Sequence, residues 1–282
     1  MIRIRPVTSR LAVVLAILLP SAAAFAQTGS TSLQLTYEVE WGNLDVATTT
    51  ADWVFGEDRF ELVATSQTVG ITDALRKYRG RTELTGRIRD GRYMPHRLSL
   101  SGLSKGRSRE AFTTWAPGTG VTGTGITGTG ISATERQPDL DLDKVFPLSA
   151  EEVDGATDPF SAMLNALDTI RQTGSCKASA RIYDGLRTSR ITLHDLGREV
   201  LEKDRPFAYQ GNTVVCGLVG TPTGGHQRKS RWRKKQPKPE DILIFVAEVR
   251  PDIFLPVRIQ ARSFLGAITA RLVMPSLKFS KN

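Results

Sequence analysis

Apolar and polar side chains alternate along segment after segment of this chain. In residues 33–41, the clearest case, the apolar members of the alternation are Leu33, Leu35, Tyr37, Val39 and Trp41. A period of two places every second side chain on the same face, which is typical of a β-strand with one buried face. Less regular alternation recurs at residues 47–55, 60–64, 84–88, 94–100, 178–183, 189–196, 213–219, 242–249, 255–261 and 266–273. We therefore expect a mainly β protein with about a dozen antiparallel strands.

One segment has the period of a helix instead. Asp158 can cap its start, Pro159 suits its first turn and Gly174 can end it. Between these limits the large apolar residues fall on one face, namely Phe160, Met163, Leu164, Leu167 and Ile170. One amphipathic helix among many strands predicts a curved antiparallel sheet or open half-barrel with the helix packed against it.

The Asp90-Gly91 pair predicts a tight hairpin turn, because glycine tolerates the positive φ that such turns require. On the return strand, His96 has the parity of its apolar neighbours Met94, Leu98 and Leu100. We therefore expect His96 to lie in the core or to line it, rather than to act in catalysis.

Residues 1–26 have the organisation of a cleavable secretory signal. A basic start precedes an apolar stretch from Leu11 to Leu19, and small residues stand at positions 24 and 26. The apolar stretch is shorter than the roughly 20 residues that a membrane-spanning helix needs. We expect cleavage after Ala26, a periplasmic or secreted protein without a transmembrane segment, and one β-rich domain over residues 27–282.

The net charge is +9, of which residues 1–26 contribute three, and most of the remaining excess lies in one place, the basic loop at residues 222–240, which contains seven cations. Because the excess of positive charge is local and the chain is expected to be exported, the sequence argues against nucleic-acid binding. Cations around an aromatic residue could contact anionic lipid head groups or an acidic envelope polymer. An exposed, solvated loop is the preferred interpretation. The candidate anion contacts are Arg228, Lys229, Arg231, Trp232, Arg233, Lys234 and Lys235.

The chain has two cysteines, Cys176 and Cys216. In an oxidising compartment this count predicts one disulfide, worth roughly 4 kcal/mol of stability in the chain-entropy model. A redox or metal site is disfavoured, because there is no Cys-x-x-Cys and the chain contains only three histidines.

Two catalytic motifs occur, and neither has the context that its chemistry needs. Gly102-Leu-Ser104-Lys-Gly106 matches a hydrolase nucleophile elbow, with His194 and Asp168 or Asp184 downstream. However, the segment after Gly106 resembles a returning strand rather than a helix, which favours a hairpin. The dinucleotide pattern G-x-G-x-x-G at residues 118–128 falls within a low-complexity segment, 117–144, without helical periodicity. We expect no enzymatic activity and no cofactor.

The predicted sheet has more apolar surface on one face than a single helix can cover. Six side chains of consistent parity are expected to line a cavity, namely Tyr37, Val39, Trp41, Trp53, Met94 and Leu98. An open apolar cavity is the usual form of a small-molecule site, so a lipid or a lipoprotein is the expected partner.

Several runs resemble an uncharacterised bacterial family, domain of unknown function 3108. They are Leu35-Thr-Tyr-Glu-Val-Glu-Trp-Gly42, Thr157-Asp-Pro-Phe-Ser-Ala162, and Cys176 through Tyr183-Asp-Gly185 together with Cys216. The resemblance covers most of the chain after residue 26. It implies an exported envelope protein and carries over no catalytic residue. The outline is also similar to lipoprotein-carrier half-barrels, which implies a concave sheet able to hold acyl chains.

Two functions therefore stay open. The first is a non-catalytic envelope protein that binds a lipid or another hydrophobic ligand in a β cavity. The alternative is a structural or interaction protein attached to anionic envelope components through its basic loop, with the interior of the sheet filled by side chains.

Overall fold

Most of the chain is β-strand, as the alternation predicts. The computed structural model describes residues 29–104, 106–116, 130–138, 143–228, 237–263 and 266–281. Within these residues the strands are β1 (Thr31–Trp41), β2 (Leu44–Phe55), β3 (Arg59–Thr68), β4 (Tyr78–Arg89), β5 (Arg92–Ser104), β6 (Arg107–Trp115), β7 (Ile131–Gln137), β8 (Ala178–Tyr183), β9 (Thr188–Leu201), β10 (Gly211–Gly224), β11 (Ile242–Arg250), β12 (Ile253–Ser263), β13 (Gly266–Leu272) and β14 (Lys278–Lys281).

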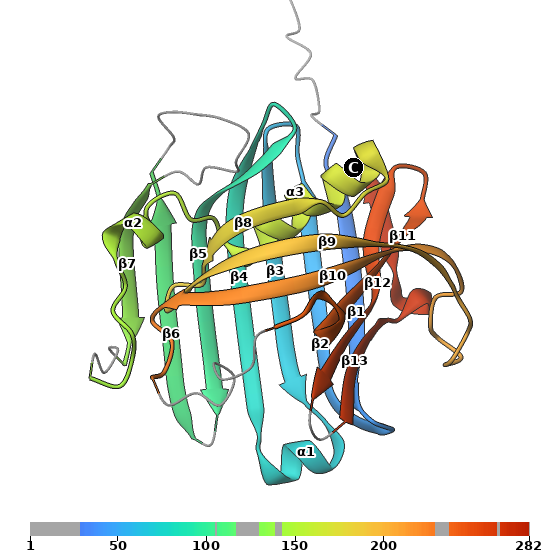
Figure 1. Ribbon diagram of the computed structural model, residues 1–282, viewed down its shortest axis with the longest axis horizontal. Helices are drawn as coiled ribbons and strands as arrows, with labels where there is room; N and C mark the ends of the chain where they lie inside the picture. Colours follow the sequence, from blue (N-terminus) through green and yellow to red (C-terminus); the bar gives the residue numbers. More distant parts are fainter. Residues whose placement is uncertain are drawn as a thin grey trace, which may run out of the picture.

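All of the described strands belong to one antiparallel sheet in the order β7-β6-β5-β4-β3-β2-β1-β13-β12-β11-β10-β9-β8, with β14 beside β1. The chain runs as a meander from β1 to β7, crosses over, and returns as a second meander from β8 to β13. The first strand therefore lies in the middle of the sheet, between β2 and β13. The sheet does not close on itself, and it curls so that β8, β9 and β10 pass in front of β3–β6 (Figure 1).

The long helix, α3 (Pro159–Thr173), begins and ends where the sequence predicts. The Asp158 carboxylate caps it by accepting hydrogen bonds from the backbone N–H groups of Phe160 (2.8 Å) and Ser161 (3.1 Å). Gly174 ends it in the left-handed conformation, with φ of 67°. The helix packs against β5, β8 and β12 and so lies between the two halves of the curled sheet.

The main core follows one row of paired residues across the first meander. Leu33 pairs with Trp53, Trp53 with Leu62, Leu62 with Leu84, and Leu84 with Leu98. All five side chains are buried, and burial of such a side chain stabilises the folded state by about 1.5–3 kcal/mol. This row gives the sheet the buried face that the alternation predicts.

A β-bulge in β5 overturns the predicted position of His96. Thr85 pairs with Arg97 but Gly86 pairs with Pro95, so His96 is one extra residue in β5. The bulge puts Met94 and Leu98 on opposite faces, although the sequence predicted one face for both. His96 is exposed, and the prediction of a core histidine is therefore wrong.

Six described elements were not predicted from the sequence. They are the short helices α1 (Gly70–Leu75) and α2 (Ala150–Val153), the 3-10 helices η2 (Pro239–Asp241) and η3 (Met274–Ser276), and the strands β7 and β14. β7 falls inside the low-complexity segment 117–144 and forms one edge of the sheet. None of the described helices is long and apolar enough to cross a membrane.

A buried ion network fastens the β9–β10 connection onto the middle of the sheet. Glu40 on β1 accepts hydrogen bonds from Arg205 (Nε to Oε1, 2.9 Å) and from Arg271 on β13 (Nη1 to Oε2, 2.8 Å). Arg271 also pairs with Asp204 (2.7 Å), and Arg258 on β12 pairs with the same carboxylate (3.0 Å). Only 3% of Glu40 is exposed. The network therefore joins four segments that are far apart in the chain.

Candidate functional site

An apolar groove lies between α3 and the face of the sheet made by β8–β12, with a volume of about 250 Å³. The helix contributes Pro159, Ala162, Met163, Ala166, Leu167 and Ile170. Their spacing of three and four residues places them on one face of α3. The sheet contributes Ala178, Ser179, Ala180, Ile182, Ile191, Leu193, Cys216, Leu218, Ile244, Val246, Pro256 and Ile259.

Strand pairing brings the sheet side of the groove together. Ala180 pairs with Ile191 between β8 and β9, and Leu193 pairs with Leu218 between β9 and β10. Ile244 pairs with Ile259 between β11 and β12. Directly paired residues point to the same face, so five neighbouring strands present one continuous apolar surface toward the helix.

The groove stays open because small residues face each other across it. Ala162 and Ala166 on the helix stand opposite a sheet whose edge strand carries Ala178 and Ala180. A larger side chain at any of these four positions would occupy part of the space. The larger apolar side chains around them remain only half-buried, namely Ile182, Ile191, Leu193, Leu218, Ile244 and Ile259. An apolar surface left uncovered in this way is a typical mark of a binding site.

The lining offers almost no polar chemistry. Among the residues that the structure places around the groove there is no Asp, Glu, His, Lys or Arg, and Ser179 supplies the one hydroxyl. Such a lining excludes water and contacts hydrocarbon, but it provides no group for proton transfer. Elsewhere in the described part of the chain, no cluster of three or more His, Cys, Asp or Glu residues could hold a metal ion.

A second apolar cavity, of about 230 Å³, lies on the other side of α3, and Leu167 lines both cavities. Its walls include Leu33, Phe55, Tyr93, Leu164, Leu255 and Phe279. Unlike the groove, it also has charged residues in its lining, Asp168, Arg171 and Asp252. Arg171 pairs with Asp168 at 2.8 Å. The helix thus separates a purely apolar groove from a cavity with a charged lining on one part of its wall.

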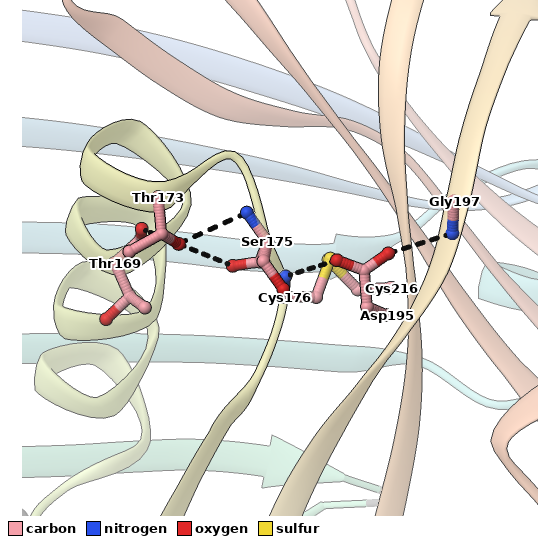
Figure 2. Close-up of a disulfide and its surroundings, with 7 residues drawn as sticks. All are labelled: Thr169, Thr173, Ser175, Cys176, Asp195, Gly197 and Cys216. Atoms are coloured by element: carbon pink, nitrogen blue, oxygen red, sulfur yellow. Dashed lines mark hydrogen bonds between the residues drawn. A yellow bond between two sulfur atoms is a disulfide. The ribbon is translucent and has the colours of Figure 1, made fainter.

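The predicted disulfide between Cys176 and Cys216 is confirmed, and it fixes the C-terminal end of α3 (Figure 2). Cys176 follows the helix by three residues, and Cys216 lies on β10 with its side chain in the groove lining. The carboxylate of Asp195 accepts hydrogen bonds from the backbone N–H groups of Cys176 (3.2 Å) and Gly197 (2.9 Å). Hydrogen bonds from Ser175, Gly197 and Cys176 lower the pKa of Asp195.

The middle and the start of α3 are held by polar contacts with the other half of the sheet. The Asn165 amide donates to the backbone oxygen of Tyr93 (2.8 Å) and accepts from its N–H (3.0 Å). Burial raises the pKa of the capping residue Asp158. The Trp115 indole donates to the carbonyl of Ala156, just before the helix, at 2.9 Å. These contacts hold the start and the middle of α3 against β5 and β6.

None of the six residues predicted to line a cavity lines this groove. Trp53 and Leu98 are packed in the main core, with 3% and 1% of their surface exposed. Tyr37 is half-buried and donates its hydroxyl to the backbone oxygen of Pro256 (2.8 Å), and burial raises its pKa. Val39 is half-buried, and Trp41 is 40% exposed. Met94 lies on the face opposite Leu98 because of the bulge.

The groove could have been recognised from a different signal in the sequence. Ala178 and Ala180 alternate with Ser179 and Arg181 in a predicted strand, and the isoleucine and leucine alternations follow in the next segments. The pattern shows an apolar face with two small residues. It does not show which element that face meets, because the helix precedes the strands in the chain and could pack on any of them.

The basic loop is described only in part. Arg228 donates from Nε to the backbone oxygen of Val145 (2.9 Å), and its guanidinium lies 5.3 Å from the centre of the Phe146 ring. It therefore serves to hold the base of the loop. The other candidate anion contacts lie outside the described residues, namely Lys229, Arg231, Trp232, Arg233, Lys234 and Lys235.

The hairpin predicted around Ser104 is confirmed. Ser104 ends β5, pairs with Arg107 and is followed at once by β6, whereas a nucleophile elbow needs a helix at this point. The Asp184 carboxylate caps a turn by accepting from the N–H groups of Leu186 and Arg187. The glycine pattern at residues 118–128 and the signal at residues 1–26 lie outside the described residues.

Comparison with known proteins identifies a family over most of the chain. The family described as "Protein of unknown function (DUF3108)" matches residues 36–273. A solved structure that is similar is the beta-barrel-like protein of domain of unknown function DUF1849 from Brucella abortus. It has 10% sequence identity and a TM-score of 0.44, over 89% of this chain and 98% of that one. No curated protein matches the chain in sequence.

Proposed function

The chain belongs to the DUF3108 family, and from that premise we propose that it is an exported, non-catalytic protein that binds the hydrocarbon chain of a lipid or lipoprotein. The observation that supports this proposal is the groove beneath α3. Its lining is apolar on both the helix side and the sheet side, and it contains no ionisable side chain.

The size of the groove favours a slender ligand. Ligand sites usually have volumes of about 300–1,000 Å³, and the groove, at about 250 Å³, lies just below that range. A single acyl chain fits such a space better than a bulky ring system does. Each methylene group removed from water contributes roughly 0.8 kcal/mol to binding before the costs of association.

The absence of polar groups from the lining sets the expected specificity. With Ser179 as the one hydroxyl in the described lining, the groove has no charged group with which to pair a carboxylate or phosphate. Hydrogen-bonding groups are what usually fix orientation and distinguish one ligand from another. We therefore expect the head group of the ligand to remain outside, and chain length to matter more than head-group chemistry.

Export is part of the proposal. A disulfide such as Cys176–Cys216 persists in oxidising compartments and is rare in the cytosol. The signal-like residues 1–26 are consistent with the same destination, the periplasm or the exterior. N-terminal sequencing of the exported protein should find Gln27 first, and a chain that retains Met1 would contradict cleavage.

The groove can be tested by filling it. Ala180→Phe and Ala166→Phe each place an aromatic ring where the opposed alanines leave space, whereas Ala133→Phe adds the same ring at an exposed position on the edge strand β7. The wild-type chain and Ala133→Phe should bind a dansyl-labelled fatty acid with one-to-one stoichiometry. The groove variants should bind it at least roughly ten-fold more weakly, the equivalent of about 1.4 kcal/mol.

Circular dichroism melting should show that the groove variants remain folded. If the folded wild-type protein takes up no probe, or if all three variants bind it equally, the groove is not a ligand site. A structural or interaction protein attached through its basic loop would then be the better interpretation.

A further inference from the structure

Exposed apolar side chains gather at one end of the sheet, where four connections between strands meet. We call this set the apolar rim. Its members are Trp41, Leu44, Ile71, Leu75, Leu103 and Ile268, with between 37% and 77% of their surface exposed. Figure 1 shows this end at the bottom, with α1 projecting from it.

Strand pairing places three members of the rim side by side. Trp41 pairs with Leu44 on one side and with Ile268 on the other. α1 lies against the start of β2, where the N–H of Val69 donates to the carbonyl of Val46 (3.1 Å). Leu103 lies further along the same end, at the turn between β5 and β6.

Helix α1 is oriented with its apolar side away from the protein. Its polar side is bonded to the sheet, since Asp73 pairs with Arg79 (2.7 Å) and accepts a hydrogen bond from the hydroxyl of Thr68 (2.9 Å). Ile71 and Leu75 face solvent, with 61% and 77% of their surface exposed, and no residue of the helix is buried. A surface helix normally buries its apolar side, so the fold holds these two side chains outward against the hydrophobic effect.

Positive charge surrounds the rim. Arg76 and Lys77 directly follow α1, Arg107 stands beside Leu103, and Arg262 precedes the β12–β13 turn. All four are exposed. The nearby acids include Asp45, its neighbour Glu38, and Asp73, which is paired with Arg79.

Exposed leucine, isoleucine and tryptophan among cations are the combination that binds the surface of an anionic bilayer. The apolar side chains enter the boundary between head groups and acyl chains, and the cations pair with phosphates. A protein partner would also meet apolar side chains, but the exposed cations near the rim match a surface of negative charge.

We propose that the apolar rim docks the protein onto an anionic lipid bilayer. The rim shares no residue with the groove beneath α3, so this inference does not rest on the proposed ligand. It places the proposed lipid-binding protein at a membrane surface, because a protein that holds a lipid chain must exchange that chain with a membrane.

Vesicle flotation tests the docking surface. The full mature chain should float with vesicles of phosphatidylglycerol and phosphatidylethanolamine and less with phosphatidylcholine alone. Ile71→Ser with Leu75→Ser should weaken binding by at least ten-fold, and Arg76→Gln with Lys77→Gln should weaken it by roughly five-fold per charge. Both variants should melt like the wild type, because all four side chains are exposed.

Matched controls use residues of the same kind outside the rim. Val54→Ser with Leu196→Ser removes two other exposed apolar side chains. Arg89→Gln with Arg92→Gln removes two exposed cations beside the β4–β5 turn, at the opposite end of the sheet. Both control pairs should leave flotation unchanged.

Three outcomes would overturn the proposal. In the first, the rim variants float as well as the wild type. In the second, vesicle binding is lost only when the basic loop at residues 228–235 is neutralised. In the third, the rim variants change the sedimentation coefficient and not vesicle binding, which would make the rim an interface between two copies. Ala180→Phe should float normally and the rim variants should bind the fatty-acid probe normally, so failure of the groove and failure of the rim can be told apart.

Discussion

At the scale of single residues, Glu40 is the clearest case of a charge whose partners determine its behaviour. Burial by itself would raise its pKa, but the hydrogen bond from Arg205 and the positive charge of Arg271 outweigh burial and hold the pKa below its usual range. The same holds for Asp204. Burial alone would raise its pKa, but Arg271 and Arg258 outweigh burial and lower it. Both carboxylates are thus held in their charged form by arginines from other strands.

Arg271→Met should destabilise the protein by about 3 kcal/mol at neutral pH, because it removes one of the two arginines that pair with the buried carboxylate of Glu40 and also breaks the ion pair with Asp204. A lowered pKa means that the stabilisation is present above pH 4.5 and is lost as the pH falls through the folded-state value. The cost of the substitution should therefore shrink on acidification. Urea denaturation at pH 7 and pH 3 measures it. A cost that is equal at both values would mean that lost packing, not charge, is the cause.

At the scale of elements, α3 is the part of the fold on which the candidate site depends. It is fixed at its start by the Asp158 cap, in its middle by Asn165 and shortly after its end by the disulfide. Its groove-facing side carries two alanines at positions 162 and 166. A helix held at three points and packed loosely between them keeps the groove open without collapsing onto the sheet.

Removal of the disulfide by Cys176→Ala with Cys216→Ala should lower the free energy of unfolding by about 4 kcal/mol, because the bond closes a loop of 40 residues in the unfolded chain. The same loss should follow reduction of the wild-type protein. Thermal melts with and without a reductant measure it. The double variant serves as the control, since its melting should not respond to the reductant.

At the scale of the whole molecule, the order of strands places the first strand at the centre of the sheet and β7 and β8 at its edges. β1 is hydrogen-bonded on one side to β2 and on the other to β13 and β14. Its partner β13 is more than 200 residues away in the chain. The sheet is therefore complete only when both meanders have folded.

Amide hydrogen exchange should reflect this arrangement. The N–H groups of β1 and of its buried neighbours should exchange only through global unfolding, whereas those of β7 should exchange through local opening, because an edge strand has a partner on one side alone. Exchange followed by mass spectrometry measures the difference. Protection of β7 equal to that of β1 would contradict this expectation and would mean that another segment covers the free edge of β7.

The local features of this protein follow from its sequence. The alternation at residues 33–41 predicts β1, and Asp158, Pro159 and Gly174 define α3 to the residue. The two cysteines, together with the expectation of export, predict the disulfide. Each of these predictions depends on residues that are close in the sequence or on the number of cysteines. The family resemblance, confirmed over residues 36–273, rests on short runs of the same kind.

The tertiary structure alone decided where the apolar surface is left uncovered. One extra residue at His96 reverses the parity of Met94, and the expected cavity residues Trp53 and Leu98 are packed in the core. The groove forms instead where α3 meets β8–β12, and Glu40 meets Arg271 across 231 residues. Periodicity shows that a strand has an apolar face. Which element covers that face depends on pairing between segments distant in the chain, and that pairing is established only when the whole sheet assembles.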